Sequence, residues 1–370
     1  MRKIFAVLLV LTVASMAFAT GSSDKGLIGL AMPETHVARW LKDGNSLKSE
    51  AEKRGYSALV QWADANQLVQ NNQIQSFILQ GAKVLVVGCI NDGVAPMISE
   101  ARREGISVIA YDRIIQNSED YDYYITFNNF KVGQLQGQSI ADALNLGAAT
   151  ADNPKLITLF AGSPTDGNAF FFFDGAMSIL NPYIEKGVLN VIGPYPQTSA
   201  DRANFLRITT ENWQAPIAKT RMENLLNGDA RTVTLDAILA PNDPIARAVI
   251  EACRADAKYR DKLPIVSGQD AEFASMMSIK NGDQYMTVFK DTAKLAEAAI
   301  ILADAIIKGQ APRIPNSVIA EDIGLGQIGD TGKKRVITYL LDPVPVTKSS
   351  NFNAPVTAGF FPADEAAQLR

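Results

Sequence analysis

The sequence predicts an α/β protein made of two similar lobes, each with a doubly wound parallel sheet covered by helices on both faces. Continuous apolar runs at residues 27–31 and 156–160 are typical of strands that are buried on both faces. Segments with apolar residues at helical spacing separate such runs. The chain has 370 residues, which is more than one hydrophobic core usually holds. We therefore expect two lobes rather than one.

In the first half of the chain, strands are expected at 27–31, 84–87 and 108–110, and helices at 40–53, 68–79 and 94–101. Gly55, Gly81 and Gly105 each follow a predicted helix and precede a predicted strand. A residue in this place commonly adopts a left-handed conformation, which glycine tolerates. The first half therefore winds repeatedly from strand to helix.

The second half repeats this pattern. Strands are expected at 156–160, 237–240 and 265–267, with a helix at 245–254. Polar segments follow these strands at 162–168, 241–243 and 268–270. Ligands bind at the carboxyl ends of strands in open α/β sheets. We therefore expect the polar strand ends of the two lobes to face each other across a cleft.

The N-terminus has the features of a secretory signal. Arg2 and Lys3 precede an apolar stretch at 4–16, and Ala17-Phe18-Ala19 has the small-x-small pattern of a cleavage site. The stretch is short for a transmembrane helix, and no cysteine follows it to carry a lipid. We predict a signal peptide at 1–19, cleaved near Ala19, and an exported soluble protein.

Charge and cysteine content limit the partners and the redox chemistry. Removing Arg2 and Lys3 changes the formal charge from −4 to −6, and the chain has no block of basic residues. This balance argues against nucleic acid and anionic membranes as partners. Cys89 and Cys253 fall in different predicted lobes. A disulfide between them would join two bodies that need to move, so we expect two buried free thiols.

The most informative segment is Asp112-Arg113, which directly follows the apolar run at 108–111. A carboxylate only accepts hydrogen bonds when ionised, and a guanidinium only donates them. Together at a cleft, the two can hold neighbouring hydroxyls of a neutral polyol such as a sugar. The alternative is a salt bridge between Asp112 and Arg113 that closes a turn.

Several short segments together resemble one protein family. They are Gln73-Ile74, Gly81-Ala82-Lys83-Val84-Leu85-Val86, Ala110-Tyr111-Asp112-Arg113, Gly162-Ser163-Pro164, Ser267-Gly268-Gln269-Asp270-Ala271 and Thr287-Val288-Phe289-Lys290. Their order and spacing are similar to those of the type I periplasmic binding proteins, in the branch that binds xylose and multiple sugars. The resemblance extends from Leu27 to about Val346.

This resemblance implies a type I periplasmic binding protein fold, in which the chain crosses a hinge three times. It assigns 25–129 plus 291–325 to an N-terminal lobe and 130–290 plus 326–370 to a C-terminal lobe. It also implies a monomeric periplasmic receptor that closes around one monosaccharide and delivers it to the permease of an ABC transporter. We expect an aldose of the xylose, glucose, galactose or arabinose type, and no cofactor and no metal.

The resemblance also implies which residues bind the ligand. The main candidates are Arg39, Asp112, Arg113, Asn168, Trp213, Asn242, Asp270 and Lys290. The secondary candidates are His36, Trp40, Phe172 and Gln269. Amides, carboxylates and guanidinium groups bind hydroxyls, and an indole packs on the C–H face of a pyranose. Three basic candidates also leave a uronic acid as a possible ligand.

Several candidates have a simpler interpretation. Trp213 could pack against the start of a helix, Asn242 and Asp270 could be helix caps, and Lys290 could be a solvated lysine at a strand end. His36, the single histidine of the chain, could lie in a partly exposed loop. These alternatives remain open at the level of the sequence.

Two other functions are alternatives to a transport receptor. Asp112 and Asp270 could imitate the carboxylate pair of a glycosidase, but nearby basic residues and amides favour ionised acceptors over a carboxylic acid. A single histidine also makes a zinc site or a catalytic triad a poor hypothesis. The same fold also serves sensing, with a chemoreceptor or a sensor kinase as the partner, and sequence does not separate sensing from transport.

Overall fold

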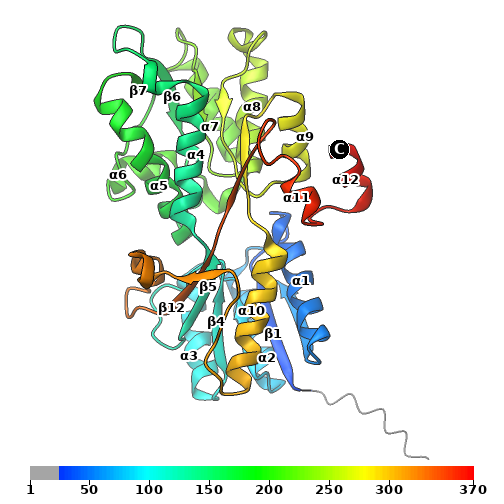
Figure 1. Cartoon of the computed structure of the whole chain (residues 1–370). Coiled ribbons are helices and arrows are strands. Elements are labelled where there is room, and N and C mark those ends of the chain that lie inside the picture. The colour runs from blue at the N-terminus through cyan, green and yellow to red at the C-terminus, as the bar shows by residue number, and fades with distance from the viewer. Residues whose placement is uncertain (1–24) are drawn as a thin grey trace, which may run out of the picture.

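The computed structural model describes residues 25–370, which form two α/β lobes (Figure 1). The first lobe, which we call the N-lobe, has a seven-stranded sheet in the order β11-β12-β5-β4-β3-β1-β2. Its strands are β1 (Leu27–Met32), β2 (Ser57–Trp62), β3 (Val84–Val87), β4 (Ser107–Tyr111), β5 (Tyr123–Phe127), β11 (Ser317–Ile319) and β12 (Ile337–Leu341). All neighbouring strands are parallel except β11 and β12, which are antiparallel at one edge.

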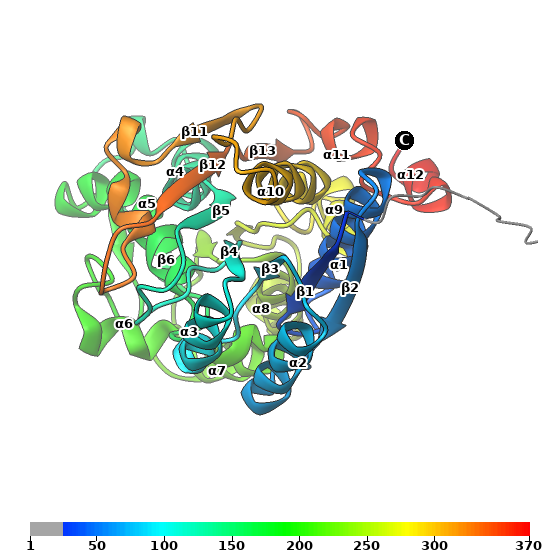
Figure 2. The same ribbon diagram turned by 90° about the horizontal axis from the view of Figure 1, so that it is seen from below.

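Helices cover both faces of this sheet (Figure 2). They are α1 (Arg39–Lys53) and α10 (Thr292–Ile307) on one face, and α2 (Gln67–Leu79) and α3 (Ala95–Arg103) on the other. Side chains alternate along a strand, so Val84 and Val86 of β3 pack in one core while Leu85 and Val87 pack in the other. The strand is therefore apolar at every position, as the sequence predicted.

The second lobe, which we call the C-lobe, has a parallel sheet in the order β7-β6-β8-β9 and a separate antiparallel pair, β10 and β13. Its strands are β6 (Lys155–Leu159), β7 (Leu189–Val191), β8 (Ala237–Leu239), β9 (Ile265–Val266), β10 (Met286–Phe289) and β13 (Val344–Thr347). Its helices are α4 (Asn129–Ala143), α5 (Gly167–Glu185), α6 (Arg202–Ile208), α7 (Ala215–Asn227), α8 (Asp243–Ala255), α9 (Phe273–Asn281), α11 (Ala354–Thr357) and α12 (Ala363–Leu369).

Helices α4 and α5 pack closely because glycine lies where their backbones meet. A Cβ atom on Gly133 would lie 1.9 Å from the carbonyl oxygen of Phe172, and one on Gly175 would lie 2.0 Å from that of Phe130. Any side chain at these positions would force the helices apart. The close approach fixes α5 in the C-lobe and with it the position of Phe172.

The chain changes lobe three times, and one of these changes differs from the expected boundary. The first falls between β5 and α4, and the second between β10 and α10. The third was expected at 325/326, but β12 lies parallel to β5 in the N-lobe sheet, so the chain crosses only at 342–343 (Figure 1). The expected boundary was wrong because a short buried strand can join the edge of either sheet, and pairing alone decides which.

Both cysteines are buried free thiols, as predicted. Cys89 follows β3 in the N-lobe, and Cys253 lies in α8 of the C-lobe. Burial raises the pKa of each thiol to about 12, so both stay protonated at neutral pH. They pack as small apolar side chains rather than as reactive groups.

The predicted signal peptide, residues 1–19, lies outside the described residues. From residue 25 to the C-terminus, no helix combines the length and apolar character that crossing a bilayer requires.

Candidate ligand-binding site

A cavity between the two lobes is formed by the loops after β1 and β4 of the N-lobe and after β6, β8, β9 and β10 of the C-lobe. Its lining residues are Val37, Arg39, Trp40, Asp112, Arg113, Asp166, Asn168, Phe172, Trp213, Asn242, Gln269, Asp270 and Lys290. All eight main candidates are among them, as are three of the four secondary ones. The structure therefore brings residues from position 39 to position 290 together around one space.

Arg39 and Asp112 form the centre of the N-lobe side of the cavity. Nη2 of Arg39 lies 2.9 Å from Oδ2 of Asp112 and 2.7 Å from Oδ2 of Asp43, one helical turn further along α1. All three side chains are buried. Burial by itself would raise the pKa of Asp112, but the charges of Arg39, Lys290 and Arg113 outweigh it, and the pKa is lowered. Asp112 is therefore an ionised acceptor.

The backbone of Asp112 is held in an uncommon conformation. Its φ is 62°, in the left-handed region that a residue with a side chain seldom adopts. Its carbonyl oxygen accepts hydrogen bonds from the hydroxyls of Tyr124 (2.7 Å) and Thr126 (3.0 Å) and from Nδ2 of Asn168 (2.8 Å). Strained residues of this kind occur at functional sites, where the surrounding structure fixes them.

Arg113 is paired with residues other than Asp112. Its Nη2 donates to Glu34 at 2.9 Å, and its Nε lies 3.0 Å from Oδ2 of Asp166 in the C-lobe. Within residues 25–370, no ion pair joins Asp112 and Arg113, so the turn salt bridge considered from the sequence is wrong. Each of the two side chains therefore has its own partners: Asp112 pairs with Arg39, and Arg113 pairs with Glu34 and Asp166.

On the C-lobe side, Lys290 and Asp270 form a buried ion pair. Nζ of Lys290 lies 2.9 Å from Oδ1 of Asp270, and only 3% of Lys290 and 7% of Asp270 is exposed. These values exclude a solvated lysine at the strand end. Asp270 is also not the cap of the following helix, because the residue at the N-cap of α9 is Glu272.

Asn242 caps a helix and lines the cavity at the same time. Its Oδ1 accepts the backbone N–H of Ile245 at 3.1 Å, at the start of α8. The capping interpretation is therefore correct, and it leaves the amide N–H groups and one lone pair of Oδ1 of Asn242 for a ligand.

Asn168 ties the two lobes together. Besides its bond to Asp112, its Oδ1 accepts from Nδ2 of Asn129 at 2.7 Å and from the hydroxyl of Tyr124 at 3.2 Å. Asn168 lies near the start of α5 in the C-lobe, whereas Asp112 and Tyr124 are in the N-lobe. Much of its hydrogen-bonding capacity is therefore used within the protein when the lobes are closed.

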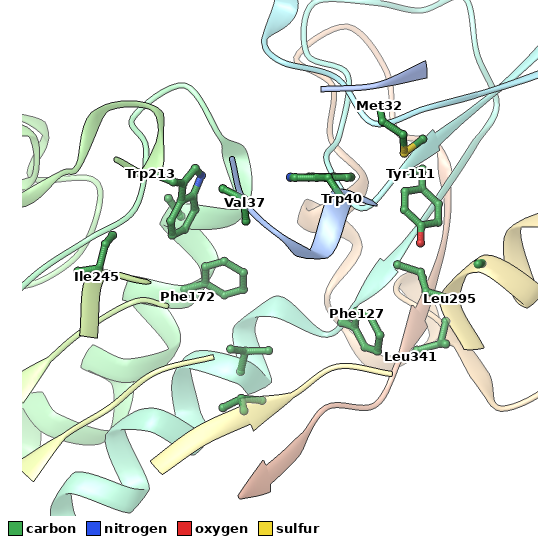
Figure 3. Packing of buried hydrophobic residues seen from close by; sticks show 14 of the residues in the cluster. Met32, Val37, Trp40, Tyr111, Phe127, Phe172, Trp213, Ile245, Leu295 and Leu341 are labelled. Atoms are coloured by element: carbon green, nitrogen blue, oxygen red, sulfur yellow. The ribbon is translucent and has the colours of Figure 1, made fainter. Parts of the chain in front are cut away.

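Aromatic side chains line the cavity from both lobes (Figure 3). Trp213 lies on Gly162, where a Cβ atom would come within 2.0 Å of the indole, and its Nε1 donates to Oδ2 of Asp166 at 3.2 Å. The ring of Phe172 meets Trp213 edge to face at 6.3 Å. Of the four consecutive phenylalanines of α5, Phe172 is the one that lines the cavity. Trp40 supplies an N-lobe ring.

His36 does not line the cavity but connects the lobes at its rim. Its side chain is 41% exposed, and its Nε2 lies 2.9 Å from Glu34 and 3.2 Å from the carbonyl oxygen of Asn212 in the C-lobe. The hydrogen bond with Glu34 raises the pKa of His36, an effect that partial burial opposes. The interpretation of His36 as a partly exposed loop histidine is correct.

Sequence reasoning missed some residues of the site. Asp166 lines the cavity. Asp43 and Glu34 do not line it but form ion pairs with Arg39 and Arg113, respectively. Asp166 lies in the polar segment 162–168, which the sequence predicts at a strand end. Asp43 lies four residues after Arg39 on the same helix, and this spacing favours an ion pair. Glu34 has no such signal, because its contact with Arg113 spans 79 positions.

Four polar atoms of cavity-lining residues have no hydrogen-bond partner in residues 25–370, namely Nε of Arg39 and Arg113, Oε1 of Gln269 and Oδ1 of Asp270. Ion pairs reach Nε of Arg113 and Oδ1 of Asp270, which leaves Nε of Arg39 and Oε1 of Gln269. One donates and the other accepts, so together they suit a ligand with hydroxyl groups, which does both. The described residues contain no cluster of three or more histidine, cysteine or acidic side chains that could hold a metal ion.

Comparison with known protein sequences identifies the family. The model of the periplasmic binding protein domain matches residues 28–311. The multiple sugar-binding periplasmic receptor ChvE of Rhizobium radiobacter is 39% identical over 348 residues, which are 93% of each chain. The D-xylose-binding periplasmic protein of Escherichia coli is 34% identical over 339 residues, with 91% of this chain and 92% of that protein covered.

Solved structures agree with these sequence matches. An ABC transporter solute binding protein from Clostridium phytofermentans with bound β-D-glucose has a TM-score of 0.81 and 35% identity, covering 92% of this chain and 99% of that one. A carbohydrate transporter solute binding protein from Chloroflexus aurantiacus in complex with D-glucose has a TM-score of 0.80 and 30% identity, covering 92% and 98%. The predicted fold class is confirmed, and the chain belongs to the periplasmic binding protein family.

Proposed function

We propose that this protein is an exported sugar receptor that closes its two lobes around one monosaccharide and delivers it to the permease of an ABC transporter. The observation that carries the proposal is the cavity between the lobes, where a buried set of acceptors and donors surrounds Arg39 Nε and Gln269 Oε1, which lack protein partners. A hydroxyl group can satisfy both atoms. Leaving each unpaired costs about 1–3 kcal/mol, so a sugar that pairs them gains affinity.

Binding works by favouring the closed arrangement of the lobes. Contacts that join the lobes include Arg113 with Asp166 at 3.0 Å, Asn168 with the carbonyl of Asp112 at 2.8 Å and His36 with the carbonyl of Asn212 at 3.2 Å. A sugar that touches both halves of the cavity does so fully only when these contacts form. The ligand therefore shifts the population toward closure, and the closed surface is what the permease recognises.

The proposed ligand class is a neutral aldose of the xylose, glucose, galactose or arabinose type. Arg39, Asp112, Arg113, Asn168, Trp213, Asn242, Asp270 and Lys290 are the proposed contacts. Three cations pair with five carboxylates within the site: Lys290 with Asp270, Arg39 with Asp43 and Asp112, and Arg113 with Glu34 and Asp166. With carboxylates in excess, the site favours hydroxyl groups over a uronic acid carboxylate.

The proposal is tested by ligand-induced stabilisation and by closure. A panel of monosaccharides is added to the purified mature protein, and the sugar that binds should raise the melting temperature by mass action. Small-angle scattering with and without that sugar should show a smaller radius of gyration in its presence. No stabilisation by any aldose, or an unchanged radius at saturating sugar, would contradict the proposal.

We further propose that the protein does not process glycosides. Arg39 contacts both Asp112 and Asp270, at 2.9 Å and 3.9 Å, and the lowered pKa of Asp112 makes it a poor proton donor. Incubation of the protein with aryl glycosides should release no aglycone. If turnover is seen and the Asp112→Asn variant shows it equally, the activity belongs to a contaminant.

Export, oligomeric state and partner choice belong to the same proposal. The mature chain is proposed to begin after Ala19 in the periplasm and to be a monomer, which N-terminal sequencing of the secreted protein and light scattering test directly. A chemoreceptor or a sensor kinase that binds the closed form is proposed as an additional partner. Uptake of labelled sugar by vesicles that contain the permease separates delivery from signalling.

A further inference from the structure

A second groove lies beside the cavity, and the proposed function does not use it. It has a volume of about 460 Å³, which is within the range of small-molecule sites. The N-lobe contributes Asn91, Gln116 and Asn117 to its wall, and the C-lobe contributes Phe170 and Arg202. The groove is therefore formed between the lobes, as the cavity is.

The groove and the cavity share one wall. Arg113 and Asp166 line both spaces, and their side chains lie 3.0 Å apart. Arg113 comes from the N-lobe and Asp166 from the C-lobe, so this wall is a single ion pair that forms when the lobes close. A ligand that extended from the cavity into the groove would keep the pair apart.

The C-lobe side of the groove presents a guanidinium that is held in place by stacking alone. The central carbon of the Arg202 guanidinium lies 4.6 Å from the centre of the Phe170 ring, which packs against Phe205 at 5.3 Å. In the part of the chain that the structure describes, the Arg202 side chain has no ion pair and no hydrogen bond. Arg202 is exposed, so its donors face solvent and are free to bind a ligand in the groove.

The N-lobe side of the groove presents amides. Gln116 Nε2 makes one long hydrogen bond of 3.4 Å to the carbonyl of Asp330, and Asn117 Nδ2 donates to Asp92 at 2.7 Å. These amides keep carbonyl oxygens that can accept hydrogen bonds. A guanidinium above an aromatic ring, facing amides, is the same hydroxyl-binding chemistry that lines the cavity.

We propose that this groove is a second sugar subsite, so that the protein takes disaccharides with one ring in the cavity and the next ring in the groove. The inference rests on the proposed function, because the first ring must occupy the cavity. A bound disaccharide separates Arg113 from Asp166 and leaves the lobes less closed. Disaccharides therefore bind more weakly than the matching monosaccharide.

The test is calorimetric titration of the mature protein with D-glucose and D-xylose and with cellobiose and xylobiose, their β-linked disaccharides. We expect a disaccharide to bind about tenfold or more weakly than its monosaccharide, which corresponds to about 1.4 kcal/mol. Arg202→Ala should weaken the disaccharide a further tenfold or so and change the monosaccharide less than about twofold, because Arg202 is outside the cavity.

Arg207→Ala is the matched control, because Arg207 is an exposed arginine on the same helix that does not line the groove. If Arg202→Ala lowers the melting temperature, Gln116→Ala on the N-lobe wall of the groove replaces it, and this variant should also weaken disaccharide binding selectively. Monosaccharide binding without any disaccharide binding overturns the subsite and leaves the proposed function intact. Equal losses for both sugars in Arg202→Ala also overturn the subsite, and failure to bind any of xylose, glucose, galactose and arabinose overturns both proposals.

Discussion

The two halves of the cavity hold their charged groups in different ways. In the N-lobe, Arg39 keeps Asp43 and Asp112 as partners, and Arg113 keeps Glu34, whatever the position of the other lobe. In the C-lobe, Lys290 keeps Asp270, but Asp166 is paired with a cation only when Arg113 arrives from the N-lobe on closure. The N-lobe half is thus fully preorganised, whereas closure completes the C-lobe half. This difference implies that the sugar docks first on the N-lobe.

Removal of Arg113 should have the largest effect on binding. Arg113→Ala leaves Asp166 buried without its cation and Glu34 with His36 as its remaining partner, and breaking a buried pair in this way costs about 3–5 kcal/mol. We expect the affinity for sugar to fall at least about a hundredfold and the free energy of unfolding to fall as well. Arg103→Ala, an exposed arginine on α3, is the control. A loss of affinity within threefold would show that the site is assigned wrongly.

Removal of Lys290 tests the other half and should cost less. Lys290→Ala removes the close partner of Asp270, which retains Arg39 at 3.9 Å across the cavity. We expect sugar affinity to fall about tenfold, since a charged hydrogen bond contributes about 1.5–3 kcal/mol. Titration of this variant beside Arg113→Ala measures the asymmetry directly. A loss as large as that of Arg113→Ala would remove the distinction between the halves.

Substitution of Gly162 should disturb the aromatic wall of the C-lobe alone. A Cβ atom there would lie 2.0 Å from the indole of Trp213, so Gly162→Ala must displace that ring. Overpacking of this kind costs about 1–3 kcal/mol, and we expect sugar affinity to fall about fivefold. The control is Gly147→Ala, because a Cβ atom at Gly147 meets no atom within 4 Å. Unchanged tryptophan fluorescence on sugar binding would argue against a role for Trp213.

The smallest effect is expected at the rim, where His36 joins the two halves. The hydrogen bond with Glu34, in the same lobe, raises the pKa of His36, and the carbonyl oxygen of Asn212 in the C-lobe adds to this effect, so closure favours the protonated ring. The extra stability of the closed form is complete below the ordinary pKa of histidine and is lost as the pH rises through the raised pKa. We expect sugar affinity to decline about two- to threefold over this interval, because the side chain is partly exposed.

Titration at several pH values, with His36→Gln as the comparison, measures this contribution. The variant should have the affinity of the unprotonated protein at every pH. A decline that persisted in His36→Gln would assign the pH dependence to other groups and leave the rim contact without a role in closure.

Much of the site could be predicted because polar residues follow buried strands at a recognisable place. Asp112, Asn242, Asp270 and Lys290 all stand just after apolar runs, and parallel strands bring such ends to one edge of a sheet. Asp166 could have been found by the same rule. Glu34 could not, because its role depends on contact with Arg113 across the fold.

By itself, the sequence determined the two α/β lobes, the buried strands, the free thiols and the set of residues that meet between the lobes. The lobes and strands follow from apolar periodicity and local order along the chain, whereas the set of site residues follows from the resemblance to the periplasmic sugar-binding proteins. Only the tertiary structure decided which partner each charge takes, that β12 joins the N-lobe sheet, and that one ion pair separates the cavity from the groove. The reason is physical: strand pairing and buried ion pairs are selected by the packing of distant segments against each other.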